Sequence, residues 1–226
     1  KSATFMPKPL YGDNGNDIIS GAGGTDTITG DAGDDVFSVA LGAASTAIVR
    51  IEDFGNGADS FRGVLSSTGQ LDVTIYNTST TTLDLSKVLG ASGKASVTGG
   101  SAADTIIGGA AVDTINGGTG NDDIKAGAGN DGINGQGGDD TLTGGLGDDA
   151  FTVDAGTDTI TDWGTGTDTL TISAGTASYT VPTAGGTVAT FASITNAGTL
   201  VIDASSSKAV TIVGSTGVDS ITGSEY

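Results

Sequence analysis

The sequence predicts an all-β fold, built as a flattened coil of short stacked strands, and three observations predict it. From Gly99 to Thr152 the chain divides without a gap into six nine-residue repeats, and a shorter array of three covers residues 12–38. Each repeat is rich in Gly in its first half and carries a large apolar residue at its eighth position. Windows that favour helix are scarce, because Gly recurs at almost every third step. A period of nine fits six residues that turn and three that extend.

The predicted strands are centred on the eighth position. It holds Ile19, Ile28, Phe37, Ile106, Ile115, Ile124, Ile133, Leu142 and Phe151. A three-residue strand is too short to be stable alone, so these side chains must be buried against their equivalents in neighbouring turns. The segments between the arrays are rich in Thr, Val, Ile and Ser, and their alternating stretches are typical of strands.

The sixth position is Asp in every clear repeat, and we predict that it binds metal. The clear repeats supply Asp17, Asp26, Asp35, Asp104, Asp113, Asp122, Asp131, Asp140 and Asp149, and degenerate repeats supply Asp59, Asp158, Asp168 and Asp219. Stacking would align the carboxylates of alternate repeats along one edge, where they repel one another unless a cation lies between successive turns. Carboxylate and carbonyl oxygens suit Ca²⁺, whereas Zn²⁺ and copper prefer nitrogen or sulfur ligands.

The pattern GGxGxDxUx, in which U is a large apolar residue, resembles the RTX nonapeptide of calcium-binding secreted proteins. The resemblance implies a right-handed parallel β-roll with two repeats per turn, in which Ca²⁺ lies between loops i and i+2. It implies about five or more ions, at the pairs Asp17 with Asp35, Asp104 with Asp122, Asp113 with Asp131, Asp122 with Asp140, Asp131 with Asp149, and Asp140 with Asp158. The repeats depart from the pattern at Ala102, Ala111 and Ala126, each of which replaces a Gly.

We expect five segments along the chain. They are a first β-roll block with a cap at 1–62, a β-rich connector at 63–89, the main block with a cap at 90–171, a second connector at 172–213, and the start of a further repeat at 214–226. Phe54 and Trp163 are predicted to plug the core at the two caps. The alternative makes the nearby Asp53 and Asp162, or Asp59 and Asp168, terminal calcium ligands.

Composition excludes several function classes. The chain of 226 residues has a formal charge of −19, which disfavours nucleic acid as a partner. It contains no His and no Cys, so it lacks imidazole-based or thiol catalysis and disulfides. No 18-residue apolar stretch would span a membrane, and any targeting segment is missing or was removed. The adjacent acids Asp139-Asp140 and Asp148-Asp149 could suggest a glycosidase, but their repeat positions explain them, so we expect no enzyme.

Three functions fit these observations. The first is a secreted, self-assembling subunit of a cell-surface layer or filament, because the composition is similar to RTX-bearing surface-layer proteins of Gram-negative bacteria. Its partners would be copies of itself, added head to tail at the lone repeat 214–222, and cell-surface polysaccharide. The second is a calcium-triggered folding and secretion module of a larger exoenzyme, toxin or adhesin, exported by a type I channel. The third, a surface module for sugars or ice, rests on Thr-rich stretches alone.

Overall fold

The computed structural model describes residues 9–21, 26–41, 48–53, 60–65, 70–74, 82–86, 93–162, 166–174, 176–180, 191–196, 199–204 and 218–223. Within these ranges the regular structure is entirely β, which confirms the predicted all-β class. Among the same residues, no helix has the length and apolar character that a membrane span requires.

The strands lie in two long stacks. The odd-numbered strands up to β19 form one ten-stranded sheet: β1 (Pro9–Tyr11), β3 (Asp26–Thr29), β5 (Ile48–Asp53), β7 (Gln70–Thr74), β9 (Lys94–Thr98), β11 (Thr114–Thr119), β13 (Gly132–Gly137), β15 (Ala150–Val153), β17 (Asp168–Ile172) and β19 (Phe191–Asn196). A three-stranded sheet contains β2 (Ile18–Gly21), β4 (Val36–Leu41) and β6 (Ser60–Leu65). An eight-stranded sheet contains β8 (Thr82–Asp84), β10 (Thr105–Ile107), β12 (Asp123–Ala128), β14 (Thr141–Leu146), β16 (Thr157–Asp162), β18 (Thr176–Thr180), β20 (Thr199–Ala204) and β21 (Val218–Gly223).

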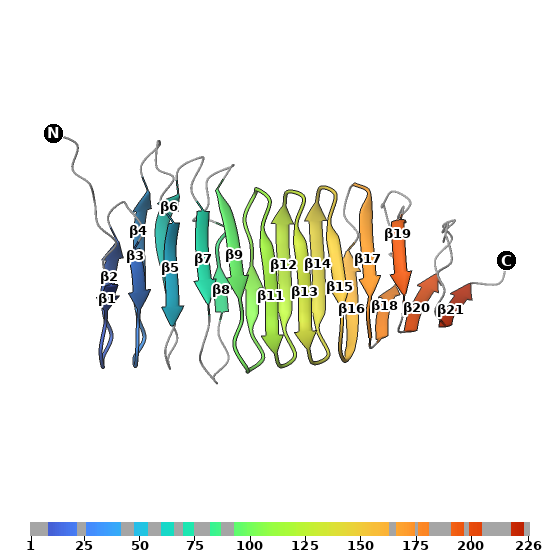
Figure 1. The fold of residues 1–226 in the computed structure, drawn as a ribbon, viewed down its shortest axis with the longest axis horizontal. Coiled ribbons are helices and arrows are strands. Elements are labelled where there is room, and N and C mark those ends of the chain that lie inside the picture. The colour runs from blue at the N-terminus through green and yellow to red at the C-terminus, as the bar shows by residue number, and fades with distance from the viewer. Residues whose placement is uncertain are drawn as a thin grey trace.

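The chain winds as a parallel β-roll. All paired strands are parallel, and strands up to β20 alternate between the two sides, so two repeats make one turn. Ile115 pairs with Ile133, and Ile106 pairs with Ile124, which places identical repeat positions directly above one another. Figure 1 shows the strands stacked in chain order along the long axis of the molecule.

The core lies between the two stacks and is built by the eighth position of the repeats. Ile106, Ile115, Ile124 and Leu142 are 0% exposed, and Phe151 is 1% exposed. The flanking seventh and ninth positions face outward. Stacking therefore buries the apolar stripe that no single short strand could bury, as the period predicts.

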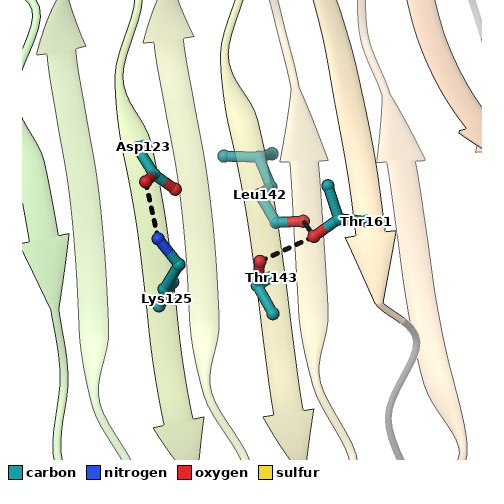
Figure 2. Close-up of polar contacts among 5 residues, drawn as sticks. All are labelled: Asp123, Lys125, Leu142, Thr143 and Thr161. Atoms are coloured by element: carbon teal, nitrogen blue, oxygen red, sulfur yellow. Dashed lines mark hydrogen bonds and ion pairs between the residues drawn. The ribbon is translucent and has the colours of Figure 1, made fainter.

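The outer face of the eight-stranded sheet carries polar contacts between neighbouring positions (Figure 2). Lys125 Nζ lies 2.6 Å from Asp123 Oδ2 within β12, and both side chains are exposed, so this ion pair adds little stability. The hydroxyls of Thr143 and Thr161 lie 2.7 Å apart across β14 and β16. Thr161 also donates to the carbonyl oxygen of Leu142 at 3.3 Å.

The β-rich connecting segments continue the same stacks. Strands β7 and β8 contribute the buried side chains Val73 and Leu83, and the roll proceeds from them into the main array. At the other end, β16 pairs with β18 and β17 pairs with β19, so strands stack beyond the predicted cap at Trp163. Phe54 and Trp163 themselves lie outside the described residues. The nine-residue spacing gains one residue near the end of β16: the register of β14 against β16 shifts beside Thr143, and Ala150 then lies opposite Thr169, 19 residues further on.

Candidate metal centre

The sixth-position aspartates of alternate repeats are linked into two series in the main block: Asp104, Asp122, Asp140 and Asp158 on one side of the roll, and Asp113, Asp131, Asp149 and Asp168 on the other. Together with the pair Asp17 and Asp35 of the first array, we call them the sixth-position ladder. The backbone N–H of each Asp donates to the Oδ1 atom of the Asp one turn further on. The distances are 2.9 Å for Asp17 to Asp35, 2.8 Å for Asp104 to Asp122, Asp113 to Asp131 and Asp122 to Asp140, 2.9 Å for Asp131 to Asp149, 3.2 Å for Asp140 to Asp158, and 2.9 Å for Asp149 to Asp168. The structure thus brings together each Asp pair that the resemblance implies.

The second carboxylate oxygen of the ladder is buried without a hydrogen-bond donor. This holds for the Oδ2 atoms of Asp17, Asp122, Asp131, Asp140, Asp149 and Asp158. A buried carboxylate oxygen that lacks a donor is costly, because the charge has lost its water. A repeated row of such oxygens fits a hard cation such as Ca²⁺, which takes 6–8 oxygen ligands.

Burial also raises the pKa of these carboxyls, because the low-dielectric surroundings disfavour the charged form. The pKa of Asp131 and of Asp158 is raised to about 7, and the pKa of Asp122 and of Asp168 to about 6. Donation from a backbone N–H lowers each pKa, and the negative charges of neighbouring aspartates raise it further. A bound cation would favour the ionised form instead.

Local backbone geometry opens the turn around most of the ladder residues. The second and fourth positions take positive φ at Asp13, Gly15, Asp31, Gly33, Gly118, Gly120, Gly127, Gly129, Gln136, Gly138, Gly145 and Gly147. Gly at the first position has a different reason. A Cβ on Gly135 would collide with Asp140 Oδ2, and one on Gly117 would collide with Asp122 Oδ2. The pattern therefore favours Gly at the second and fourth positions because φ is positive there, and at the first position because the Asp side chain lies close to it.

Two ladder residues differ from the rest. Asp104 Oδ2 accepts the N–H of Gly100 at 3.0 Å, and Asp113 Oδ2 accepts the N–H of Gly109 at 2.7 Å. Ala102 and Ala111 stand in these turns, whereas the turn of Ala126 keeps the open geometry of its neighbours. The three Gly-to-Ala departures are therefore not equivalent.

The fifth position forms a second ladder that the sequence analysis missed. Asn121 Oδ1 accepts the N–H of Asp139 at 3.1 Å, and Asn130 Oδ1 accepts the N–H of Asp148 at 3.1 Å. Asp139 and Asp148 accept in turn from the N–H groups of Thr157 and Thr167, each at 2.8 Å. The available signal was the recurrence of Asn or Asp just before the ladder Asp.

Asp154 is a further carboxylate that sequence reasoning did not select. Its Oδ2 accepts from the side-chain amide of Asn134 at 3.2 Å, and its Oδ1 is buried without a hydrogen-bond partner. Its negative charge raises the pKa of Asp140 and of Asp158. Asp154 occupies the second position of a degenerate repeat, where the pattern gives no signal.

The remaining predicted residues lie apart from the main ladder. Asp26 is buried and lies opposite Val49 in the register of β3 and β5. Asp219 lies opposite Leu200 on β21, and Asp59 lies outside the described residues. Nowhere in the described ranges do three acidic side chains gather closely enough to hold an ion alone. Backbone carbonyl oxygens would have to complete each site.

The fold and the ladder together define a calcium-binding β-roll. The family described as RTX calcium-binding nonapeptide repeat (4 copies) matches residues 10–43, 98–133 and 126–160, which contain both Asp arrays. These ranges of the chain therefore carry RTX calcium-binding repeats, as the resemblance implied. No curated protein and no solved structure matches it.

Proposed function

We propose that this RTX repeat protein is a secreted structural protein, a self-assembling subunit of a cell-surface layer or filament, whose folding and assembly require Ca²⁺. One observation carries the calcium requirement: the row of buried Asp Oδ2 atoms that receive no hydrogen bond. Without a cation this row is a stack of desolvated negative charges in the turns of the roll.

Calcium dependence fits secretion. A ligand that binds the folded chain alone stabilises it by mass action, so folding follows the concentration of free metal. Proteins that carry these repeats are typically secreted by bacteria. Such a chain would stay unfolded at low intracellular Ca²⁺ and fold outside the cell. The carboxylates that give it a charge of −19 would then serve as calcium ligands.

Two observations support a structural role over a catalytic one. The described carboxyls with a raised pKa all belong to the sixth-position ladder, where the fold accounts for them. The sequence also lacks the His and Cys on which many catalytic sites depend. We therefore propose that the protein is not an enzyme.

The sheet topology supports assembly. Among the described strands, β19 pairs with β17 alone and ends the ten-stranded sheet. A parallel strand edge is a template for another chain, and a head-to-tail contact that does not close would extend into a filament or layer. Further copies of this chain are therefore the proposed partners.

Two measurements test the proposal. Circular dichroism should show β structure that decreases in excess chelator and is restored when Ca²⁺ is returned. Electron microscopy at millimolar Ca²⁺ should show ordered sheets or fibres. A β signal that chelator leaves unchanged would overturn the calcium requirement. Monodisperse particles that still need Ca²⁺ to fold would overturn assembly and favour the alternative, a calcium-triggered folding module of a larger secreted protein.

A further inference from the structure

In the first two repeats of the main array, 99–107 and 108–116, backbone N–H groups donate to the sixth-position carboxylate. Asp113 accepts the N–H of Ala95 on Oδ1 at 2.6 Å and the N–H of Gly109 on Oδ2 at 2.7 Å. Both its oxygens are therefore bonded to backbone. Asp131, one turn further on, accepts only the N–H of Asp113, on Oδ1, and its Oδ2 is buried without a donor. Two aspartates at the same repeat position thus differ in whether their Oδ2 atom receives a hydrogen bond.

The fourth position of the repeat explains the difference. In the open turns it is Gly with positive φ, for example 124° at Gly120 and 136° at Gly129. Ala102 and Ala111 occupy that position in the first two turns, and neither has positive φ, because a Cβ disfavours that conformation. The loop therefore takes another path, in which the N–H of its second residue points at the carboxylate.

The fifth position differs in the same two turns. It is Ala103 in the first and Val112 in the second, whereas the open turns of the main array carry Asn or Asp there. Within the main array, the second ladder of side-chain acceptors therefore begins at Asn121, although the first array has the same contact between the N–H of Asp34 and Asn16 Oδ1. The first two repeats therefore lack both features of the open turns: the Gly with positive φ at the fourth position and the Asn or Asp at the fifth.

The turn that precedes them contains no ladder carboxylate. Ala95, in β9, occupies the sixth position of the degenerate repeat 90–98 and is 3% exposed, and Leu85 and Val97 are also fully buried. Strand β9 pairs with β7 on one side and with β11 on the other, so apolar packing runs directly into the first two repeats of the main array.

We propose that β9, β10 and β11 with their turns form a calcium-independent base, on which the calcium-dependent turns from β12 to β16 are stacked. This inference rests on the proposed calcium-dependent folding and assigns it to one part of the roll. Asp104 and Asp113 then act as backbone-binding residues. In the main array, both carboxylates of a pair have a buried Oδ2 without a donor at Asp122 with Asp140, Asp131 with Asp149, and Asp140 with Asp158. We assign the calcium sites to these pairs.

Calcium stoichiometry of matched variants tests the assignment. Asp113→Asn and Asp131→Asn make the same chemical change one turn apart, and each keeps an oxygen for the N–H bonded to Oδ1. Isothermal titration of the full chain with CaCl₂ should find the wild-type number of ions for Asp113→Asn and at least one ion fewer for Asp131→Asn. An equal loss of ions in both variants would overturn the proposal.

Hydrogen exchange on the wild-type chain gives a test that does not depend on either variant folding. In excess chelator, the amides of Ala95, Gly100 and Gly109 should stay protected while those of Asp122 and Asp131 exchange freely. Uniform loss of protection would overturn the calcium-independent base. A wild-type chain that binds no Ca²⁺ in the titration would instead overturn the proposed function, so the two failures are distinguishable.

Discussion

At the scale of single residues, the fifth and sixth positions hold successive turns together in opposite directions. The sixth-position carboxylate accepts from the turn before it, as Asp149 does from the N–H of Asp131. The fifth-position side chain accepts from the turn after it, as Asn130 does from the N–H of Asp148. Of these two positions, the sixth leaves a buried oxygen without a donor in the described repeats and the fifth does not, so the fifth supports stacking independently of metal.

Asn130→Ala should therefore destabilise the calcium-loaded roll modestly. The lost hydrogen bond is solvent-exposed, and water can replace the acceptor, so we expect a cost of about 1 kcal/mol. Urea denaturation at saturating Ca²⁺ measures it. Asn130→Asp is the matched control, since it keeps Oδ1 and should retain most of the stability. Equal destabilisation by both variants would argue against the acceptor role.

Gly138→Ala tests the demand of the fourth position for positive φ. Gly138 has φ 138°, and a Cβ there would collide with the carbonyl oxygen of Gly120 in the preceding turn. Backbone strain of roughly 1–2 kcal/mol adds to this overlap, so we expect a large fall in melting temperature. Gly132→Ala is the control, because a Cβ at Gly132 would have nothing within 4 Å. Similar melting temperatures for the two variants would contradict this account.

At the scale of strands, the alternation of inward and outward residues determines which apolar side chains matter. Ile106 and Ile107 are neighbours in β10, and only Ile106 is fully buried. Ile106→Ala should cost about 2–5 kcal/mol, because it leaves a cavity between the sheets. Ile107→Ala should cost much less, and the comparison of unfolding midpoints checks it. A larger loss at Ile107 would mean that the strand faces are assigned the wrong way round.

The sequence predicted the strands of the arrays well, because one period determined both their spacing and their buried face. Ile115 lies over Ile133 as the eighth-position pattern requires. The stacking of β7 and β8 onto the main array was not predicted, since their alternation lacks the nine-residue period. The difference between Asp113 and Asp131 was not predictable from the Asp itself. It arises from Ala111 two residues earlier, through a backbone angle that the repeat pattern does not state.

At the scale of the whole molecule, the ladder makes stability depend on protons and calcium in opposite ways. The folded-state pKa of Asp131 and of Asp158 is about 7, well above the value of about 3.9 for an unfolded Asp. The folded chain therefore holds its protons more tightly than the unfolded chain does. Without metal, this contribution is fully present below about pH 4 and is lost as the pH rises through 7.

In excess chelator, we therefore expect the β signal in circular dichroism to grow as the pH falls from 8 to 5. In saturating Ca²⁺ the trend should reverse, because the metal requires ionised ligands and competes with protons. Relief of the overall −19 charge would also stabilise the metal-free chain at low pH, so a variant must separate the two causes. Asp131→Asn mimics the protonated side chain. It should raise the stability of the chelated protein at pH 8, flatten its pH dependence, and weaken the calcium-loaded form. An unchanged pH dependence in this variant would assign the effect to net charge rather than to the ladder.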